Sequence, residues 1–203
     1  MKKGQYIVFE AIDGAGKSTL ISKLKAHFVA KGLHCISTAE PTGNPIGSMI
    51  RHILGGRIEM SEETIAALFL ADRLDHLQNN TNGILKHIHA GTTVIGDRYY
   101  LSSYAYHVPH VSLDWVIKAN KVCADLLRPD YTFYIDISVE ESLKRITQNR
   151  QELDLFENKD RITKVRSNYM NAIEAVKDEE NIIMINGEQS PEKVFEDVLS
   201  HLK

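Results

Sequence analysis

Short continuous hydrophobic runs alternate along the chain with longer segments in which hydrophobic residues recur at helical spacing. Continuous runs are typical of strands that are buried on both faces, as the strands of parallel sheets are. The runs predict strands at residues 6–9, 34–38, 92–96, 131–137 and 181–185. The helically spaced segments predict helices at about 17–31, 46–54, 61–77, 83–90, 112–127, 139–149 and 161–177, with a terminal helix that opens at Pro191.

Strands that alternate with helices indicate parallel crossover connections. We therefore predict the α/β class, with a doubly wound sheet of about five parallel strands flanked by helices. The length of 203 residues is within the usual size of one domain, and the chain has no internal repeat, linker or low-complexity tract. We expect one domain over residues 1–203, with ligands bound at the carboxyl ends of the strands.

The first predicted strand runs directly into the sequence AIDGAGKST at residues 11–19. This sequence matches the phosphate-binding pattern G-x-x-x-x-G-K-S/T, except that Ala11 replaces the first glycine. A strand, such a loop and a helix N-terminus together bind the phosphates of a nucleoside triphosphate, so the pattern indicates a P-loop NTPase-type fold. The residues expected to bind the triphosphate are Ala11, Ile12, Asp13, Gly14, Ala15, Gly16, Lys17, Ser18 and Thr19.

Individual positions of this loop have separate roles. Gly14 and Gly16 allow the backbone to approach phosphate oxygens without a Cβ in the way. Lys17 is expected to reach the β- and γ-phosphates, and the Ser18 hydroxyl to bind Mg²⁺. Because an alanine with positive φ would be strained by about 1 kcal/mol or more, we expect a negative φ at Ala11.

Composition and charge narrow the class of partner. A net charge of −3 offers no basic surface for nucleic acid. No apolar stretch approaches the ~18 residues that a membrane span needs, and Glu10 and Asp13 interrupt the first apolar run, unlike a signal peptide. The two cysteines, Cys35 and Cys123, make no disulfide framework. We expect a cytoplasmic protein that binds neither nucleic acid nor membranes.

A group of arginines points to a second anion next to the triphosphate. Arg51, Arg73 and Arg98 can each bind a phosphate through two hydrogen bonds, which suits a phosphate acceptor. A switch GTPase is the competing class, but such proteins bind guanine with an N-K-x-D sequence. The nearest string here, NKVC at 120–123, lacks the aspartate and lies in a predicted helix.

Five segments in the right order together resemble the thymidylate kinase family. They are FEAIDGAGKST (9–19), EPTGNPIG (40–47) with Arg51 downstream, LFLADR (68–73), DRYYLSSYAY (97–106) and LRPDYTFYIDI (127–137). The resemblance covers nearly the whole chain, and the DRYxxSSxAY string is its most specific part. It implies a five-stranded parallel sheet, a homodimer, and transfer of the γ-phosphate of ATP to dTMP with Mg²⁺.

The resemblance also implies a role for each matching residue. Asp13 would accept from the 3′-hydroxyl of the deoxyribose, Phe69 would stack on thymine, and Arg73 would donate to a thymine carbonyl. Arg51 and Arg98 would hold the dTMP phosphate, while Asp97 would bind Mg²⁺ directly or through water. The implied dTMP-binding set is Asp13, Glu40, Pro41, Arg51, Phe69, Arg73, Arg98, Ser102, Ser103, Tyr106 and His107.

The implied catalytic residues are Lys17, Asp13, Arg98 and Arg150, and the segment at about 150–160 occupies the place of the family's lid. Arg145 and Arg150 would form a clamp on the ATP side. A solvated helix face also explains these two arginines and Arg73, and ordinary core positions also explain Phe69 and Tyr106.

Four positions depart from the family pattern: Ala11, Ala39, His107 and Leu155. Ala39 and Leu155 stand where arginines are often found, and His107 replaces a glutamine. A histidine titrates near neutrality, so we expect acceptor affinity to change between pH 6 and 8. The departures leave two alternatives to a dTMP kinase: a related kinase with another nucleotide or nucleoside acceptor, and a nucleotide-binding module with low activity.

Overall fold

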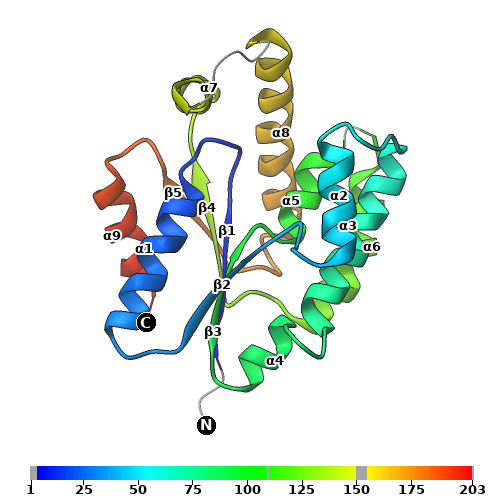
Figure 1. The fold of residues 1–203 in the computed structure, drawn as a ribbon. Coiled ribbons are helices and arrows are strands. Elements are labelled where there is room, and N and C mark those ends of the chain that lie inside the picture. The colour runs from blue at the N-terminus through cyan, green and yellow to red at the C-terminus, as the bar shows by residue number, and fades with distance from the viewer. Residues whose placement is uncertain (1–3, 109, 150–154, 203) are drawn as a thin grey trace.

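The computed structural model describes residues 4–108, 110–149 and 155–202. Five strands form one sheet in which every pairing is parallel, in the order β2-β3-β1-β4-β5 (Figure 1). The strands are β1 (Tyr6–Glu10), β2 (Cys35–Ala39), β3 (Thr93–Asp97), β4 (Tyr131–Asp136) and β5 (Ile182–Asn186). The predicted fold class is confirmed, and the predicted strands agree with the observed ones to within one or two residues.

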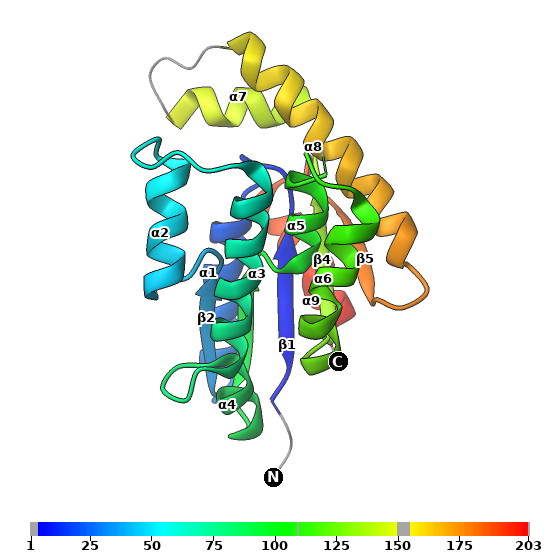
Figure 2. The same cartoon turned by 90° about the vertical axis from the view of Figure 1, so that its right-hand side faces the viewer.

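The helices connect the strands and cover both faces of the sheet. α1 and α9 lie on one side, and α3, α4, α5, α6 and α8 lie on the other (Figures 1 and 2). The helices are α1 (Lys17–Ala30), α2 (Pro45–Leu54), α3 (Glu62–Gln78), α4 (Ile84–His89), α5 (Tyr100–Tyr106), α6 (Leu113–Leu126), α7 (Val139–Asn149), α8 (Leu155–Val176) and α9 (Pro191–His201). Within the described ranges, no helix combines the length and apolar composition needed to cross a bilayer.

The centre of the core is β1, because it has a strand on each side and helices on each face. All five of its residues are buried, and Phe9 stacks on Phe133 of β4 with ring centroids 5.5 Å apart. Burial of each such side chain contributes about 1.5–3 kcal/mol. In register, Phe9 of β1 lies between Asp97 of β3 and Phe133 of β4, so β1 and β3 end side by side.

Two elements differ from the sequence expectation. α5 was not predicted, because all but one of its seven residues are buried, so it lacks the alternation of apolar and polar positions that identifies a helix. α8 begins at Leu155, six residues earlier than predicted, so the second half of the polar stretch at 150–160 is helical. Residues 150–154 lie outside the described residues.

A tight turn after β2 positions the segment that faces the ligand-binding edge. The backbone N–H and the hydroxyl of Thr42 donate to the two carboxylate oxygens of Asp72 on α3, at 2.8 and 2.6 Å. Gly47, in the first turn of α2, lies directly against this turn: a Cβ there would meet the Thr42 carbonyl oxygen at 2.2 Å. Because Asp72 holds Thr42 in place, the turn has little freedom to move away.

We therefore expect Gly47→Ala to destabilise the protein by about 1–3 kcal/mol, the usual cost of overpacking. The measurement is urea unfolding followed by circular dichroism. Gly43→Ala is the matched control, because a Cβ at Gly43 would meet nothing within 4 Å. Its stability should change by less than about 1 kcal/mol. Equal destabilisation of the two variants would contradict this account of the turn.

Candidate active site

Two cavities open at the carboxyl ends of the strands. The larger cavity has a volume of about 970 Å³ and the smaller about 290 Å³. The larger cavity is lined by the loop at 12–16 and the start of α1, and the smaller by side chains of α3 and α5. Both are lined by Asp13, Glu40, Leu54, Arg98, Tyr106 and Arg161, so they share a wall. Ligands bound in the two cavities would face each other across Asp13 and Arg98.

The loop between β1 and α1 has the backbone of a phosphate-binding loop. Gly14 and Gly16 have φ values of 77° and 86°, a left-handed conformation that favours glycine. A Cβ on Gly14 would lie 2.9 Å from the Ser142 carbonyl oxygen of α7, whereas a Cβ on Gly16 would meet nothing within 4 Å. Gly14 is therefore needed for packing on α7 as well as for its φ.

The start of α1 is suited to an anion. Gly16 is the N-cap residue, so no side chain caps the helix, and the first turn contains no acidic residue. Among the described non-glycine residues, positive φ is found at Arg98, which confirms the negative φ expected at Ala11. Ala11 is fully buried, so an alanine at this position fits the loop.

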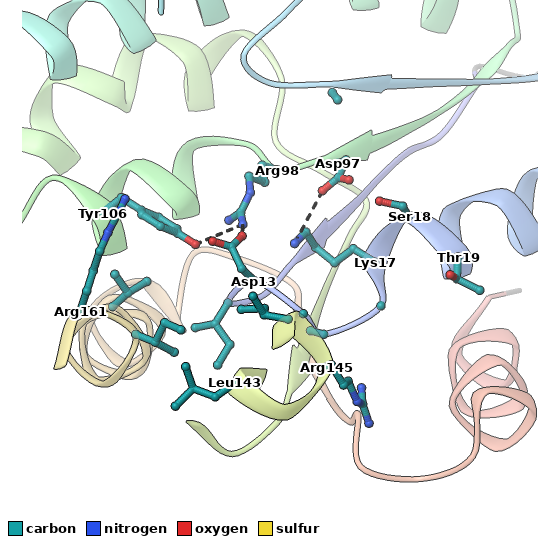
Figure 3. A pocket seen from close by; sticks show the side chains of 18 of the residues that line it. Asp13, Lys17, Ser18, Thr19, Asp97, Arg98, Tyr106, Leu143, Arg145 and Arg161 are labelled. Atoms are coloured by element: carbon teal, nitrogen blue, oxygen red, sulfur yellow. Dashed lines mark hydrogen bonds and ion pairs between the residues drawn. The ribbon is translucent and has the colours of Figure 1, made fainter. Parts of the chain in front are cut away.

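Lys17 and Asp97 lie side by side in the larger cavity (Figure 3). The Lys17 ammonium is 3.9 Å from Asp97 Oδ1, and Lys17 is only 8% exposed. Burial and the nearby Arg98 cation lower the pKa of Lys17 to about 8, although Asp97, Asp13 and Glu10 act in the opposite direction. A bound polyanion would therefore stabilise the charged form of Lys17.

Asp97 Oδ1 has the environment of a metal ligand. In the part of the chain that the structure describes, this oxygen is buried and accepts no hydrogen bond. The Ser18 hydroxyl also lines the larger cavity, and both oxygens are ligands that Mg²⁺ prefers. Among the described residues no group of three or more His, Cys, Asp or Glu side chains could hold a metal by itself. A Mg²⁺ ion here would therefore complete its coordination with phosphate oxygens and water.

Arg98 occupies the wall between the two cavities. Its Nη2 donates to Asp13 Oδ1 at 2.6 Å and to the Tyr106 hydroxyl at 3.1 Å, and its Cζ lies 4.9 Å from the centre of the Tyr106 ring. Burial opposes its charge, but Tyr106, Tyr169 and Asp13 keep the pKa of Arg98 above its ordinary value. Arg98 thus remains a cation between the two ligand volumes.

The end of the smaller cavity is formed by a buried arginine and two aromatic rings. Arg73, 1% exposed, donates through Nε to Glu40 Oε2 at 2.9 Å and through Nη1 to Ser103 and Asn120. Its Nη2 lies 2.7 Å from the same Glu40 oxygen in an ion pair. Phe69 and His107 pack together with ring centroids 5.1 Å apart. The predicted residues Glu40, Pro41, Phe69, Arg73, Ser102, Ser103, Tyr106 and His107 all line this cavity.

The titration expected for His107 between pH 6 and 8 is wrong. Burial, and then the nearby Arg73 cation, lower the pKa of His107 to about 4. The imidazole is therefore neutral near pH 7, with one ring nitrogen as a donor and the other as an acceptor.

The remaining predicted arginines differ in their positions. Arg51 lines neither cavity, because its guanidinium donates to the carbonyl oxygens of Pro41 and Thr42 and to the Ser48 hydroxyl. Arg145 lines the larger cavity and donates to Glu141 and to the Gly187 carbonyl oxygen. Arg150 lies outside the described residues, as does the side chain of Leu155.

Several residues of the site were missed by the sequence analysis. Arg161 lines both cavities, and Asn120 holds Arg73. Tyr169 accepts from Arg98 and lies between Arg98 and Glu10. The signal for Glu10 was available in the sequence, since a carboxylate at the end of a buried strand needs partners; no local pattern distinguished the other three.

Comparisons with known proteins agree with this geometry. The family model described as thymidylate kinase matches residues 9–198. A probable thymidylate kinase of Methanococcus aeolicus is 36% identical over 202 residues, which are 98% of this chain and 95% of that protein. The thymidylate kinase of Clostridium novyi is 35% identical over the full length of both chains, and that of Ligilactobacillus salivarius is 36% identical over 98% of each.

These matches span the phosphate-binding loop, the arginine between the two cavities and the segments that line the smaller cavity. The chain belongs to the thymidylate kinase family.

Proposed function

We propose that this protein transfers the γ-phosphate of ATP to dTMP, giving ADP and dTDP for DNA synthesis. The observation that carries the proposal is the shared wall. A phosphate-binding loop with a buried lysine lies on one side of Arg98, and an aromatic pocket that ends in a buried arginine lies on the other. This arrangement suits two nucleotides whose phosphates meet at Arg98.

On the donor side, the loop at 11–19 holds the triphosphate of ATP. Its amides and the ammonium of Lys17 bind the phosphate oxygens. Ser18 and Asp97 would hold Mg²⁺, which fits the buried Asp97 oxygen that accepts no hydrogen bond among the described residues. The ion, when bound, neutralises phosphate charge. Arg145 lines the same cavity, and we retain it as a contact on the ATP side.

On the acceptor side, Arg98 binds the dTMP phosphate and Asp13 accepts from the 3′-hydroxyl. Tyr106 packs against the sugar, and Phe69 stacks on the thymine ring. The edge of the base meets Arg73, Ser103 and the neutral imidazole of His107, which offers one donor and one acceptor. In this conformation Arg51 is bound to backbone carbonyls, so we give Arg98 the main part in holding the phosphate.

Catalysis needs no covalent intermediate with the protein. Phosphoryl transfer depends on alignment of the two phosphates and on stabilisation of their charge. Lys17 is a buried cation and Arg98 a partly buried one, on opposite sides of the transferring group, so both stabilise charge with reduced solvent screening. Asp13 keeps Arg98 oriented and paired until the acceptor phosphate arrives.

The test of this function is an ADP-release assay with a panel of nucleoside monophosphates and nucleosides. Preference for dTMP supports the proposal. Preference for another acceptor, such as dUMP, would identify a relative with changed specificity. Binding of ATP without transfer to any acceptor would identify a nucleotide-binding module.

The proposal includes the cellular location and the domain organisation of the enzyme. A cytoplasmic location is consistent with two free thiols, the buried Cys123 and the half-buried Cys35. We also propose one kinase domain over residues 1–203, with a lid at about 150–160 that includes Arg150 as a catalytic residue.

We propose a homodimer as well. Trp115 and Val122, seven residues apart on α6, are 43% and 45% exposed and face the same side of the helix, where a second copy would cover them. Sedimentation equilibrium at micromolar concentration is expected to give a mass near twice 22.9 kDa, and a monomer mass throughout would contradict the dimer.

Arg98→Ala is expected to lower kcat/KM for dTMP by roughly thirtyfold or more, which corresponds to about 2 kcal/mol. The reason is that the variant removes the partly buried cation that faces the acceptor phosphate. ATP affinity should stay within about twofold of the original, because the loop and Lys17 are retained. Steady-state kinetics with each substrate varied, and calorimetry with ATP, make the measurement.

Arg57→Ala is the control for this variant, because Arg57 is exposed and lines neither cavity. It should behave like the unaltered protein. Loss of ATP binding in Arg98→Ala with dTMP use intact would contradict the placement of the acceptor phosphate.

The affinity of the free protein for ATP is expected to fall as the pH rises through about 8. Lys17 has a pKa of about 8 in the free protein, where Arg98, Asp97, Asp13 and Glu10 surround it. Bound phosphate keeps the lysine protonated, so binding at higher pH must first restore the proton. Between pH 7 and pH 9 the affinity should drop by about tenfold, with proton uptake above pH 8.

Calorimetry in buffers of different ionisation enthalpy measures both quantities. Lys17→Arg is the control, because a guanidinium keeps its charge throughout this range. A flat affinity profile in the unaltered protein would show that Lys17 is already fully protonated at pH 9.

A further inference from the structure

A buried cluster of hydroxyls and one carboxylate lies directly behind Arg98. The Nη1 of Arg98 donates to the Ser102 hydroxyl at 3.1 Å, to the Tyr169 hydroxyl at 3.0 Å and to the Ala11 carbonyl oxygen at 3.1 Å. Both hydroxyls also contact Glu10 Oε2, Ser102 at 2.5 Å and Tyr169 at 3.0 Å. Glu10 and Tyr169 are both fully buried, so the carboxylate and the phenol of this arrangement lie inside the protein.

The number of available hydrogens fixes the direction of these bonds. Each hydroxyl has one hydrogen, and each lies between an arginine, which only donates, and a carboxylate. When Glu10 is ionised, both hydroxyls donate to it, and their lone pairs are turned toward Arg98. The 2.8 Å approach of Ser102 to Tyr169 is then a contact between two acceptors of the same guanidinium.

The other oxygen of Glu10 is satisfied by backbone. Oε1 accepts from the N–H groups of Tyr99 and Ser102, at 2.8 and 3.1 Å, so four donors surround the carboxylate. Burial keeps the pKa of Glu10 above its ordinary value, and Arg98 together with these donors limits the rise. Four donors and a neighbouring cation are what an ionised carboxylate needs in a dry interior.

The backbone of Arg98 also needs this support. Its φ is 72°, a left-handed conformation that side chains with a Cβ rarely adopt, and its N–H donates to the Phe9 carbonyl oxygen at 3.0 Å. Strain of this kind persists where surrounding contacts determine the geometry, as it does in many active sites. Here those contacts come from β1, α5 and α8.

Tyr169 connects the cluster to the helix that borders the cavities. Its ring packs on Tyr134 of β4 and Tyr106 of α5, with centroids 5.0 and 6.1 Å away. Two turns toward the N-terminus of α8, Arg161 and Ile162 line the larger cavity. Figure 2 shows α8 running beside α5.

We propose that Glu10 and Tyr169 are positioning residues, which hold the guanidinium of Arg98 in the orientation that receives the acceptor phosphate. Ionised Glu10 orients the two hydroxyls, and the hydroxyls fix Nη1, so that Nη2 faces Asp13 and the space between the cavities. The identity of the phosphate rests on the proposed function. The orientation of Arg98 does not.

Tyr169→Phe tests the proposal, because it removes the hydroxyl and keeps the ring that packs in the core. We expect KM for dTMP to rise about five- to tenfold, with kcat lowered less and KM for ATP within twofold. Tyr134→Phe is the matched control: the Tyr134 hydroxyl is buried, has no hydrogen-bond partner among the described residues, and belongs to a ring in contact with Tyr169. Its kinetics should be unchanged.

A purely structural role for Tyr169 predicts a different pattern. Both variants would then lower the midpoint of thermal unfolding or the active fraction, and neither would raise KM for dTMP selectively. That result would overturn the proposal, as would unchanged kinetics in Tyr169→Phe.

A second measurement needs no activity. In nitrogen-15 NMR of arginine side chains, Arg98, assigned by its loss in Arg98→Lys, should show slow rotation about Cζ–Nη in the unaltered protein. Rotation should become faster in Tyr169→Phe and in Glu10→Gln, but not in Tyr134→Phe. Equal rotation rates in all of these proteins would refute the positioning role. If no acceptor is phosphorylated, the proposed function fails, and this comparison still tests the role of Glu10 and Tyr169.

Discussion

The guanidinium of Arg98 is the point at which four segments that are distant in the sequence meet. The loop after β1 contributes Ala11 and Asp13, β3 ends directly before the arginine, α5 contributes Tyr106, and α8 contributes Tyr169. A buried cation is costly unless its donors are satisfied, so the fold has to bring these acceptors together. The parallel sheet does so by ending β1 and β3 side by side.

The acceptor pocket depends on a similar requirement. Arg73 is buried against Glu40, and His76 Nδ1 donates to the other oxygen of the Glu40 carboxylate at 3.1 Å. The same helix buries Asp72, which holds the turn at Thr42. Three of the six buried residues of α3, Asp72, Arg73 and His76, are therefore polar, and they pair with Thr42 and Glu40 in the segment after β2.

These buried polar residues explain where sequence analysis succeeded and where it failed. The strands and the phosphate-binding loop follow from local patterns: continuous apolar runs, two glycines, and a lysine at a helix start. The helical spacing of apolar residues in α3 favours Ile65, Leu68, Phe69 and Leu74 as its inward positions. Ile65 is buried, but the other three are half-buried, while Asp72, Arg73 and His76 are buried. Hydrophobic spacing carries no information about polar side chains that are buried because they have partners far away in the sequence.

The same limit applies to the site. Family motifs point to Arg98, Phe69 and Asp97, which line the cavities. They also point to Arg51, whose place depends on carbonyl oxygens that the turn at 41–42 presents. Tyr169 lies 71 residues from Arg98, and no periodic pattern connects them.

The buried Arg73 has a consequence for how acceptor preference can evolve. Its guanidinium lines the smaller cavity and is also the counterion that offsets the cost of burying the Glu40 carboxylate. Replacing Arg73 with a neutral side chain to admit another base would leave the Glu40 carboxylate with His76 as its partner among the described side chains. A substitution of Arg73 would thus change acceptor preference and the free energy of folding at the same time. A lineage that changes one must also change Glu40, or a neighbour such as Asn120, to keep the other.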